Sequence, residues 1–426
     1  MSYMSGFTLV VLGFLVFTAI FNIVVGGLEA WWRTYVWRSP ESLEITKWPE
    51  PISPDESRRH FWWVVAAKDE AANIGKTLQQ LLESTHPNYT IVVSLCTDDK
   101  STRVAVARAL RGHATWGNRV FVVHKNYDKS SKPKQLNHAL QAITARIDAG
   151  FGRHLEHWVG VVDAESLVHP GLLQRFESKI NQTGADVVLG SVQLVSLGSG
   201  MREWFRAHNC LEYYFWFRSR MQLQADKGFV PFPGNTLAIR YSLLVQEDIN
   251  GWPEDTLTED CALGVHLTAA YKAVVAVGAE PEFATREMAP STLFNKRRGA
   301  WFFQRDRWNV GFVKELLRGR WLMLPTWQER LRAFYILATP LLQAASAFLV
   351  PVSIAAVFFM KAPMPLTLLM FLPFVPLAVI MMAQLIGLRE LGREFKLRVS
   401  FWHYASVLFM TWAYQILLGV AAVYAV

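Results

Sequence analysis

Long apolar runs occupy the two ends of the chain, and a more polar middle separates them. The first run covers residues 7–27, carries no charged side chain, and is about long enough to cross a hydrocarbon core of roughly 30 Å. Three further runs, residues 333–360, 364–388 and 401–426, are also long enough to span a bilayer. The pattern therefore predicts one transmembrane helix before the polar middle and three after it.

A cleaved signal peptide is the alternative for the first run. No basic segment precedes this run, and Trp31, Trp32 and Arg33 follow it where a cleavage site would need small residues. We therefore expect the segment to be retained as a membrane helix.

Basic residues indicate how the helices are oriented. They follow the first helix at Arg33 and Arg38, and they fill the loop before the last one at Arg389, Arg393, Lys396 and Arg398. Loops rich in Lys and Arg face the cytoplasm. The number of crossings gives the same result. One helix before the polar middle and three after it place residues 33–330 inside and both termini outside. We expect a multi-pass protein of the plasma membrane with a cytoplasmic domain.

In the middle of the chain, from residue 61 to about residue 278, short β-like runs alternate with helical stretches. Four runs are typical of strands: FWWVVAA from Phe61, TIVVSLC from Thr90, RVFVVH from Arg119 and HWVGVVDAE from His157. Such alternation predicts a parallel sheet with helices on both faces. Ligands bind these sheets outside the carboxyl ends of the strands.

Acidic residues stand at three of these strand ends. The three tips carry Lys68, Asp69 and Glu70; Asp98 and Asp99; and Asp163, Ala164 and Glu165. A single acid of this kind is explained by helix capping, and for Asp69 alone that alternative is as good as a functional one. Repetition at several tips favours a ligand site that includes Asp69 and Glu70.

Asp163 and Glu165 form the most informative pair. They stand two residues apart, so at an extended strand end they point to the same side and are able to share a hard cation. Carboxylate oxygens favour Mg²⁺ or Mn²⁺. An ion there would bridge the two phosphates of a nucleotide donor and neutralise the charge on the leaving nucleotide. The spacing alone is weak, because surface acids commonly show it.

A second acidic group lies further along the chain. Thr258, Glu259 and Asp260 precede an apolar run of helical character from Cys261 to Ala270. Helix capping alone accounts for acids at a helix start. The functional alternative is a catalytic pair in which Asp260 is the general base that takes a proton from an acceptor hydroxyl.

Side chains that donate hydrogen bonds and aromatic rings are concentrated in residues 301–308, just before the C-terminal apolar runs. An interfacial belt of Trp and Arg explains them without any site. The alternative is a clamp with Arg307 on a diphosphate and Trp308 as the floor of an acceptor site. Two segments, 199–221 and 313–334, mix rings and charges as expected of amphipathic helices in the headgroup layer, with a buried helix as the alternative for the first.

Composition narrows the function classes. The formal net charge is +8, but the basic residues are spread over loops and membrane flanks, which argues against nucleic-acid binding and for anionic lipids and a phosphate-bearing substrate. Cys96, Cys210 and Cys261 are odd in number and lack the spacing of a zinc site or a disulfide framework. The apolar content of 52% exceeds that of a purely soluble enzyme.

Five short motifs occur in an order that is informative as a whole. They are DDKST from Asp98, KPKQLNHAL from Lys132, DAE from Asp163, TED from Thr258 and QRDRW from Gln304. In this order they resemble family 2 glycosyltransferases, especially the membrane-embedded branch of cellulose, hyaluronan and chitin-oligosaccharide synthases. The resemblance covers roughly residues 61–308 and the flanking helices.

The resemblance implies an α/β catalytic domain of the GT-A type, with a mixed, mainly parallel sheet, inserted between one N-terminal and three C-terminal transmembrane helices. It implies roles for individual residues: Asp99 on the nucleoside, Lys132 on the donor phosphates, Asp163 and Glu165 on the metal, Asp260 on the acceptor hydroxyl, and Gln304, Arg307 and Trp308 on donor and acceptor. The family inverts configuration, so an α-linked nucleotide sugar, with UDP as the expected nucleotide, would give a β linkage.

Two positions and one segment depart from the family pattern. The metal motif ends in Glu165 in place of Asp, and Ser131 replaces the usual Gly before the phosphate-site Lys. The segment GNTLAIR differs from the acceptor loop of polymer synthases, and we assign its first residues, Gly234, Asn235 and Thr236, to acceptor binding. This departure leaves open whether the acceptor is a growing oligosaccharide or a membrane lipid.

The predicted organisation has four parts: an N-terminal helix (1–30), a catalytic domain (55–310), an amphipathic interface region (311–332) and a C-terminal bundle (333–426). A transporter or receptor is the alternative class, and it predicts ionisable residues inside the spans. The C-terminal spans carry only His403 of that kind, while Gln343, Gln384 and Gln415 suit either helix contacts or a sugar path. The sugar, the product length and the oligomeric state stay open.

Overall fold

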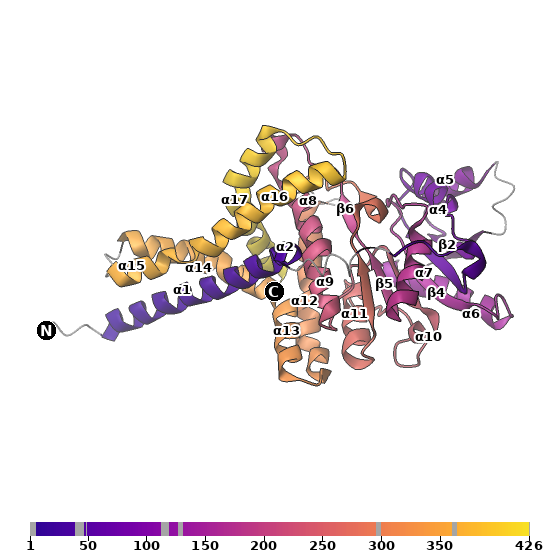
Figure 1. Cartoon of the computed structure of the whole chain (residues 1–426), viewed down its shortest axis with the longest axis horizontal. Helices are drawn as coiled ribbons and strands as arrows, with labels where there is room; N and C mark the ends of the chain where they lie inside the picture. Colours follow the sequence, from indigo (N-terminus) through magenta and orange to yellow (C-terminus); the bar gives the residue numbers. More distant parts are fainter. Residues whose placement is uncertain are drawn as a thin grey trace.

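The computed structural model describes most of the chain: residues 6–38, 47, 49–111, 119–126, 131–294, 300–359 and 364–425. Residues 1–5, 360 and 426, at the edges of the predicted apolar segments, lie outside the described part. A mixed sheet with its covering helices forms one end of the molecule, and long apolar helices form the other (Figure 1).

The main sheet has seven strands in the order β3-β2-β1-β4-β7-β5-β8. The strands are β1 (Arg59–Ala67), β2 (Tyr89–Cys96), β3 (Val120–Lys125), β4 (Glu156–Val161), β5 (Val187–Gly190), β7 (Leu237–Arg240) and β8 (Val275–Gly278). The four predicted strands are confirmed, and β1 pairs in parallel with both β2 and β4. Strand β7 runs antiparallel to β4 and β5, which makes the sheet mixed, as the resemblance implied.

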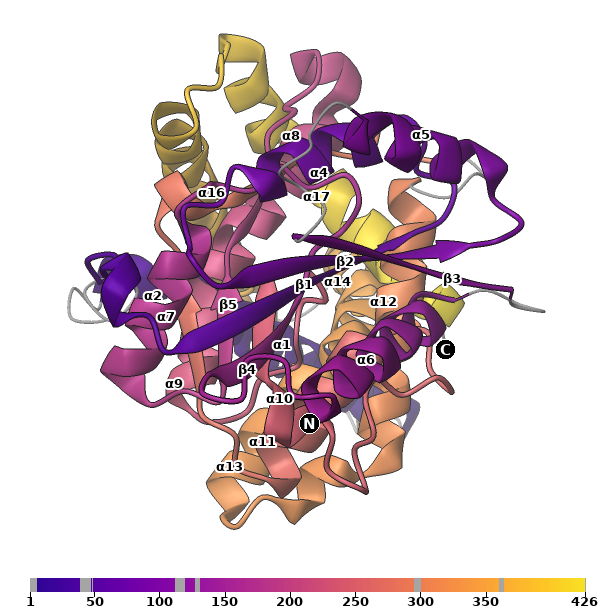
Figure 2. The same cartoon turned by 90° about the vertical axis from the view of Figure 1, so that its right-hand side faces the viewer.

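Helices cover both faces of this sheet (Figure 2). One face carries α4 (Ile74–Leu82), α5 (Lys100–Leu110) and α7 (Leu172–Thr183), and the other carries α6 (Lys132–Asp148), α10 (Tyr241–Leu244) and α11 (Glu259–Ala270). Side chains of β1 alternate between the two layers, so that Trp63 packs with α7 and Trp62 lies in the cluster formed with α6. Apolar residues on both faces explain why the strand runs are almost continuously hydrophobic.

A second, two-stranded parallel sheet pairs β6 (Val192–Leu194) with β9 (Thr285–Glu287). These three-residue strands have no hydrophobic run that would predict them from the sequence. The sheet matters for the site because it brings Glu287 beside the tip of β4.

The apolar ends form α1 (Gly6–Arg33), α14 (Thr339–Phe359), α15 (Met364–Phe371), α16 (Phe374–Glu394) and α17 (Phe401–Ala425). Among the described residues, three segments are long and apolar enough to cross a membrane: Val10–Arg33, Met364–Glu394 and Phe401–Ala425. The first predicted C-terminal span, residues 333–360, meets the same test only if α13 (Trp327–Leu337) and the start of α14, which meet at 61°, are taken as one broken span. These helices indicate membrane association.

The first predicted amphipathic segment is helical. It comprises a 3-10 turn η3 (Gly200–Glu203), α8 (Trp204–Phe215) and a π-helical turn η4 (Trp216–Arg220), and it continues into α9 (Met221–Asp226). Much of α8 is buried, since Cys210, Leu211 and Phe215 belong to a cluster that also contains residues of α16 and α17. This helix therefore joins the sheet domain to the membrane helices.

The second amphipathic segment is not one helix. Helix α12 (Trp301–Arg318) ends at Gly319, which adopts a left-handed conformation with φ +70°. A short 3-10 turn, η6 (Arg320–Met323), follows, and α13 begins after Pro325 with a capping box between Thr326 and Glu329. A glycine in the left-handed region is a common end of a helix.

Candidate active site

A cavity of about 600 Å³ lies beyond the carboxyl ends of β1 and β4, where the strand order reverses. Most of the predicted site residues line it: Glu70, Lys132, Asp163, Glu165, Asn235, Glu259, Asp260, Gln304, Arg307 and Trp308. Four predicted residues are not on its wall: Asp69, Asp99, Gly234 and Thr236. The fold thus brings four of the five motifs together from segments far apart in the sequence, and no residue of DDKST lines the cavity.

Lys132 is the first residue of α6, and its ammonium group bridges two other parts of the site. Its Nζ lies 2.5 Å from Asp163 Oδ1 and donates a hydrogen bond of 2.9 Å to the carbonyl oxygen of Gly234. Burial by itself disfavours the charged ammonium, but the carboxylates of Asp163, Glu259 and Asp260 raise the pKa of Lys132 above its ordinary value. The group is therefore a permanent cation in the cavity.

Asp260 lies at the start of α11, directly against the backbone of Gly234. One of its oxygens accepts a hydrogen bond of 2.8 Å from the backbone N–H of Cys261. The other is so close to Gly234 that an added Cβ there would lie 2.0 Å from it. Gly234 has φ +77°, so both its conformation and its lack of a side chain fit this position.

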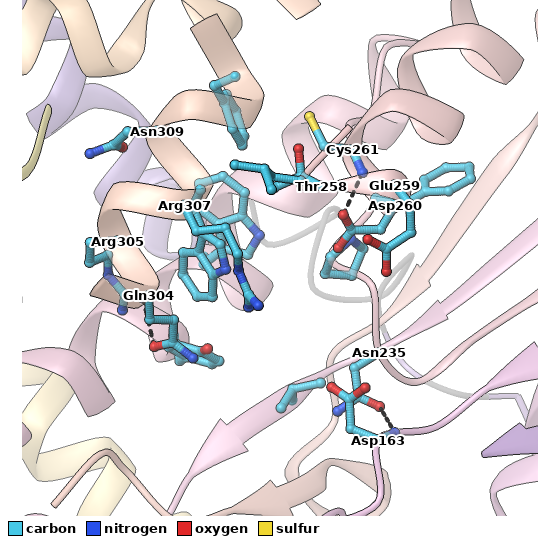
Figure 3. A pocket seen from close by; sticks show the side chains of 18 of the residues that line it. Asp163, Asn235, Thr258, Glu259, Asp260, Cys261, Gln304, Arg305, Arg307 and Asn309 are labelled. Atoms are coloured by element: carbon cyan, nitrogen blue, oxygen red, sulfur yellow. Dashed lines mark hydrogen bonds between the residues drawn. The ribbon is translucent and has the colours of Figure 1, made fainter. Parts of the chain in front are cut away.

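The neighbouring Glu259 is 7% exposed and faces the same cavity. Burial, followed by the charge of Asp260, raises the pKa of Glu259 to about 7. Burial also raises the pKa of Asp260, although Lys132 and Arg307 oppose that shift. Figure 3 shows Arg307 of α12 across the cavity from these two carboxylates. A carboxyl group with a raised pKa in a cavity is suited to accept a proton.

The tip of β4 gathers carboxylates. Burial, with the charges of Asp163 and Glu70, raises the pKa of Glu165 to about 7. Burial also raises the pKa of Glu287 to about 8, with the charges of Asp163 and Glu165 adding to it. Carboxylates that raise one another's pKa suit a divalent cation, whose charge would offset their repulsion.

A cation at this tip would depend on the donor for part of its coordination. Within the described ranges, no group of three or more His, Cys, Asp and Glu is arranged to hold a metal ion. Asp163 and Glu165 offer two carboxylates, and Mg²⁺ commonly takes one or two protein carboxylates and completes its shell with substrate phosphates and water. The donor set therefore fits such an ion.

Glu287 was not predicted, and only the folded chain reveals it. Its carboxylate accepts hydrogen bonds from Ser166 Oγ, at 2.9 Å, and from the side-chain amide of Asn235. The oxygen of that same amide accepts a bond of 3.1 Å from the backbone N–H of Asp163. Asn235 thus links Glu287 to the tip of β4, as Figure 3 shows for its bond to Asp163. Glu287 ends a three-residue strand outside every motif.

Asp99 is fully engaged by the protein. Burial alone would raise its pKa, but hydrogen bonds from Thr102, from the backbone N–H of Asp69 and from Ser101 lower it to about 2. These bonds cap α5 and hold the β1 tip, where Asp69 has φ 63°. Both the capping interpretation and a shaped nucleoside loop are consistent with this arrangement.

Thr236, predicted to contact an acceptor, points away from the cavity. Its side chain is fully buried, and its hydroxyl lies against Thr285 and Asn235. This hydroxyl is therefore bonded within the loop and to the second sheet, and the side chain does not line the cavity.

Helix α12 brings Gln304, Arg305, Arg307 and Trp308 of the QRDRW motif to the cavity wall. Arg305, which was not assigned a role from the sequence, is 2% exposed and pairs with Glu212 at 3.0 Å. Its guanidinium stacks 4.1 Å from the Trp308 ring, and that ring packs 5.9 Å from Tyr213. Arg305 therefore fixes Trp308 at the cavity wall, while Arg307 is exposed toward the cavity.

Helix α12 also packs tightly on the start of α11. A Cβ on Gly311 would lie 1.8 Å from Thr258 Oγ1, so the glycine lets α12 lie directly against the Thr258 side chain. This contact sets how far Arg307 and Trp308 of α12 lie from the Glu259 and Asp260 carboxylates.

Comparisons with known proteins follow the same outline. The sequence model of the family described as "Glycosyltransferase like family 2" matches residues 59–311. Among solved structures, mannosyltransferase PcManGT from Pyrobaculum calidifontis, in complex with GDP-Man and Mn²⁺, has a TM-score of 0.55 and 19% identity, covering 96% of this chain and 99% of that one. At this identity the match shows a shared fold.

A second structure, residues 1–349 of S. aureus TarS in complex with UDP-GlcNAc, has a TM-score of 0.41 and 15% identity, covering 79% of this chain and 91% of that one. No curated protein matches the sequence.

Proposed function

Because this chain belongs to glycosyltransferase family 2 and has a GT-A-type catalytic domain, we propose that it is an inverting, metal-dependent hexosyltransferase at the membrane. It would transfer a sugar from a nucleotide diphosphate sugar to a hydroxyl group of an acceptor. The observation that carries the proposal is the convergence of Lys132, Asp163 and Asp260 on one cavity, with Gly234 in contact with both Lys132 and Asp260.

Asp260 is the proposed general base. The acceptor oxygen would form a bond to the anomeric carbon as the bond from that carbon to the phosphate oxygen breaks. The hydroxyl proton would pass to the Asp260 carboxylate, and the bonding electrons would leave with the nucleoside diphosphate. Attack from the side opposite the leaving group inverts the configuration, so an α-linked donor would give a β-linked product.

The donor diphosphate would bind between the two sides of the cavity. Lys132 supplies a cation on one side and Arg307 a guanidinium on the other, with Gln304 beside it. A Mg²⁺ or Mn²⁺ ion held by Asp163 and Glu165 would neutralise charge on the leaving diphosphate. The β1 and β2 tips, with Asp69, Glu70 and Asp99, would surround the nucleoside.

Trp308 and the loop at Gly234 and Asn235 would receive the acceptor. The resemblance to polymer synthases predicts a growing β-linked oligosaccharide that crosses the bilayer, and that stays a prediction. A single transfer to a membrane lipid is the second candidate. It is supported by a mostly apolar cavity between the membrane helices that adjoins the catalytic one. In either case we propose that the catalytic domain faces the cytoplasm.

The test is nucleotide release from the purified chain in lipid, with Mg²⁺ or Mn²⁺, across a panel of UDP- and GDP-sugars. The GDP-sugars belong in the panel because PcManGT was solved with GDP-Man. Release from one donor identifies the sugar and the nucleotide. EDTA should abolish it, and added Mg²⁺ or Mn²⁺ should restore it.

Two variants make this test specific. Asp260→Asn keeps the shape of the side chain and removes the base, so release should fall by about 10²-fold or more. Asp255→Asn is the matched control, because Asp255 is exposed, pairs with Arg318 and does not line the cavity. Silence from folded protein across the whole panel would refute the catalytic proposal.

A further inference from the structure

Arg220 is a buried cation at the membrane side of the catalytic cavity. It is 5% exposed, lines that cavity and is the last residue of the π-helical turn η4. Its guanidinium stacks 4.9 Å from the Trp216 ring, and its Nη2 donates to Thr339 Oγ1 of α14 at 2.6 Å. Turns of π-helix inside α-helices are rare and frequently lie at functional sites.

Arg220 has no carboxylate partner among the described residues: no Asp or Glu oxygen lies within the 4.0 Å of an ion pair. Glu29, the acid of α1 near it, is already engaged. Glu29 Oε1 accepts from Arg33 Nε at 2.9 Å and from Arg33 Nη2 at 2.7 Å, and its Oε2 accepts from Trp32 Nε1 at 2.6 Å. Glu29, Arg33 and Arg220 together leave one positive charge facing the cavity.

A second cavity, of about 610 Å³, lies among α1, α14, α15, α16 and α17. It shares Glu29, Thr339 and Gln343 with the catalytic cavity, so the two adjoin at the residue that holds Arg220. Its lining is mostly aliphatic and aromatic, including Leu342, Leu377, Ile380, Trp412 and Ile416. Asn22, Tyr335, Ser346 and Gln415 are its further amide and hydroxyl groups.

We propose that the acceptor is a phosphate-bearing lipid, with its phosphate bound by Arg220 and its hydrocarbon chain in the cavity between the membrane helices. The inference rests on the proposed function, because the hydroxyl group beyond the phosphate is the one that Asp260 would deprotonate. A guanidinium matches phosphate geometry, and a low-polarity cavity at membrane depth matches a hydrocarbon chain. A saccharide chain would need hydrogen-bond partners along its length, which this lining provides at few positions.

Binding of simple probes to the full chain tests the proposal without reference to catalysis. We would titrate detergent-solubilised protein with dodecyl phosphate, with dodecyl β-glucoside and with inorganic phosphate, and count bound molecules by native mass spectrometry. We expect one dodecyl phosphate to bind at least about tenfold more tightly than either comparison probe. The glucoside lacks the charge-assisted contact, which is worth about that much, and inorganic phosphate lacks the hydrocarbon chain, whose burial strengthens binding with every CH₂ group.

Two pairs of variants separate the phosphate site from the chain site. Arg220→Gln should abolish the preference for phosphate, whereas Arg218→Gln should keep it, because Arg218 lies in the same turn but pairs with Glu394 at 2.7 Å. Val25→Trp, inside the membrane cavity, should weaken binding of both amphiphiles, while Val24→Trp should not, because Val24 is 53% exposed on the outer side of α1.

Each remaining outcome would overturn the inference. Equal binding of dodecyl phosphate and dodecyl β-glucoside would show that Arg220 does not bind the phosphate of the lipid. Equally tight binding of inorganic phosphate would indicate a free-phosphate site, and a preference unchanged in Arg220→Gln would place the anion elsewhere. Nucleotide release from the donor panel is measured in a separate assay. If the probes fail to bind as expected but release is observed, only the lipid inference fails. If no nucleotide is released, the glycosyltransferase proposal fails.

Discussion

At the scale of single residues, the contact between Gly234 and Asp260 gives the sharpest prediction. Gly234→Ala would place a Cβ 2.0 Å from Asp260 Oδ2, so the carboxylate has to move. We expect nucleotide release to fall by about 10²-fold, as expected when a general base is lost, with the domain still folded. The measurement is the release assay on the donor identified in the panel, together with a thermal unfolding curve.

Gly228→Ala is the matched control. Gly228 has φ +72°, close to the φ of +77° at Gly234, so alanine meets the same backbone strain at both sites. A Cβ at Gly228 meets no atom within 4 Å. If both variants lose release equally, backbone strain explains the effect and the Asp260 contact does not.

The raised pKa of Glu259 predicts a pH dependence of stability. Its pKa in the folded chain is about 7, above the ordinary value of 4.5, so the folded state holds this proton more tightly than the unfolded state. Stability from this group is complete below about pH 4.5 and is lost as pH rises toward 7. We expect Glu259→Gln to be more stable than the parent at pH 8, by about 1–3 kcal/mol.

At pH 4.5 the same substitution should have little effect, because glutamine then replaces a neutral carboxyl group. Thermal unfolding in nanodiscs at the two pH values measures the difference. A gain in stability of equal size at both would show that the charge of Glu259 is not its cause.

The residues that the sequence could identify are those in motifs. Lys132, Asp163 and Asp260 stand next to helix starts or strand ends, and their spacing in the chain carries the information. Glu287 and Arg220 could not be found that way, because neither belongs to a motif. Glu287 reaches the site through a three-residue strand, and Arg220 through a π-turn, and both depend on contacts between segments far apart in the chain.

At the scale of elements, the strands were predictable because burial on both faces leaves a nearly continuous apolar run. The antiparallel strand β7 was not located, since four residues after a turn carry too little pattern. The break between α12 and α13 was also missed, although Gly319 and Pro325 were visible signals. The mixture of aromatic and basic residues in segment 313–334 favoured one amphipathic helix, and that pattern was given more weight than the glycine and the proline.

Helix α12 yields a prediction about positioning. Arg305→Lys keeps the charge but loses the planar fork that contacts Glu212 and the stack on Trp308. We expect the KM for the acceptor to rise about tenfold as Trp308 loosens, while release of nucleotide from the donor alone stays near the parental rate. Separate determination of KM and kcat for the two substrates measures this.

Arg318→Lys is the control on the same helix. Arg318 pairs with Glu315 and Asp255 at the far end of α12, outside the cavity. Loss of donor turnover in Arg305→Lys, in parallel with acceptor KM, would show that the whole site has shifted and that Trp308 is not the specific target.

At the scale of the whole molecule, the catalytic domain and the membrane helices form one packed structure. Helix α8 lies beside α16 and α17 (Figure 1). It is the junction, since it shares a buried cluster with these two helices and leads directly into the turn that carries Trp216 and Arg220. The hydroxyl of Tyr214 donates to Glu390 Oε2 at 2.7 Å across this junction. Movement of the bundle therefore reaches the cavity wall through α8.

Gly387 of α16 tests this coupling. A Cβ at Gly387 would lie 2.7 Å from Phe215 Cζ, and Phe215 is fully buried, so Gly387→Leu forces α8 and α16 apart. Overpacking of this kind costs about 1–3 kcal/mol, which lowers the melting temperature by several degrees. Because α8 leads into η4, we also expect weaker binding of the acceptor than in the parent, with donor binding less affected.

Gly13→Leu provides the comparison, since Gly13 also lies in a membrane helix but a Cβ there meets no atom within 4 Å. Its melting temperature and acceptor binding should match those of the parent. If Gly387→Leu lowers the melting temperature but leaves acceptor binding intact, the junction stabilises the molecule without shaping the site. A change in both properties, absent from Gly13→Leu, means that the membrane bundle is part of the acceptor site.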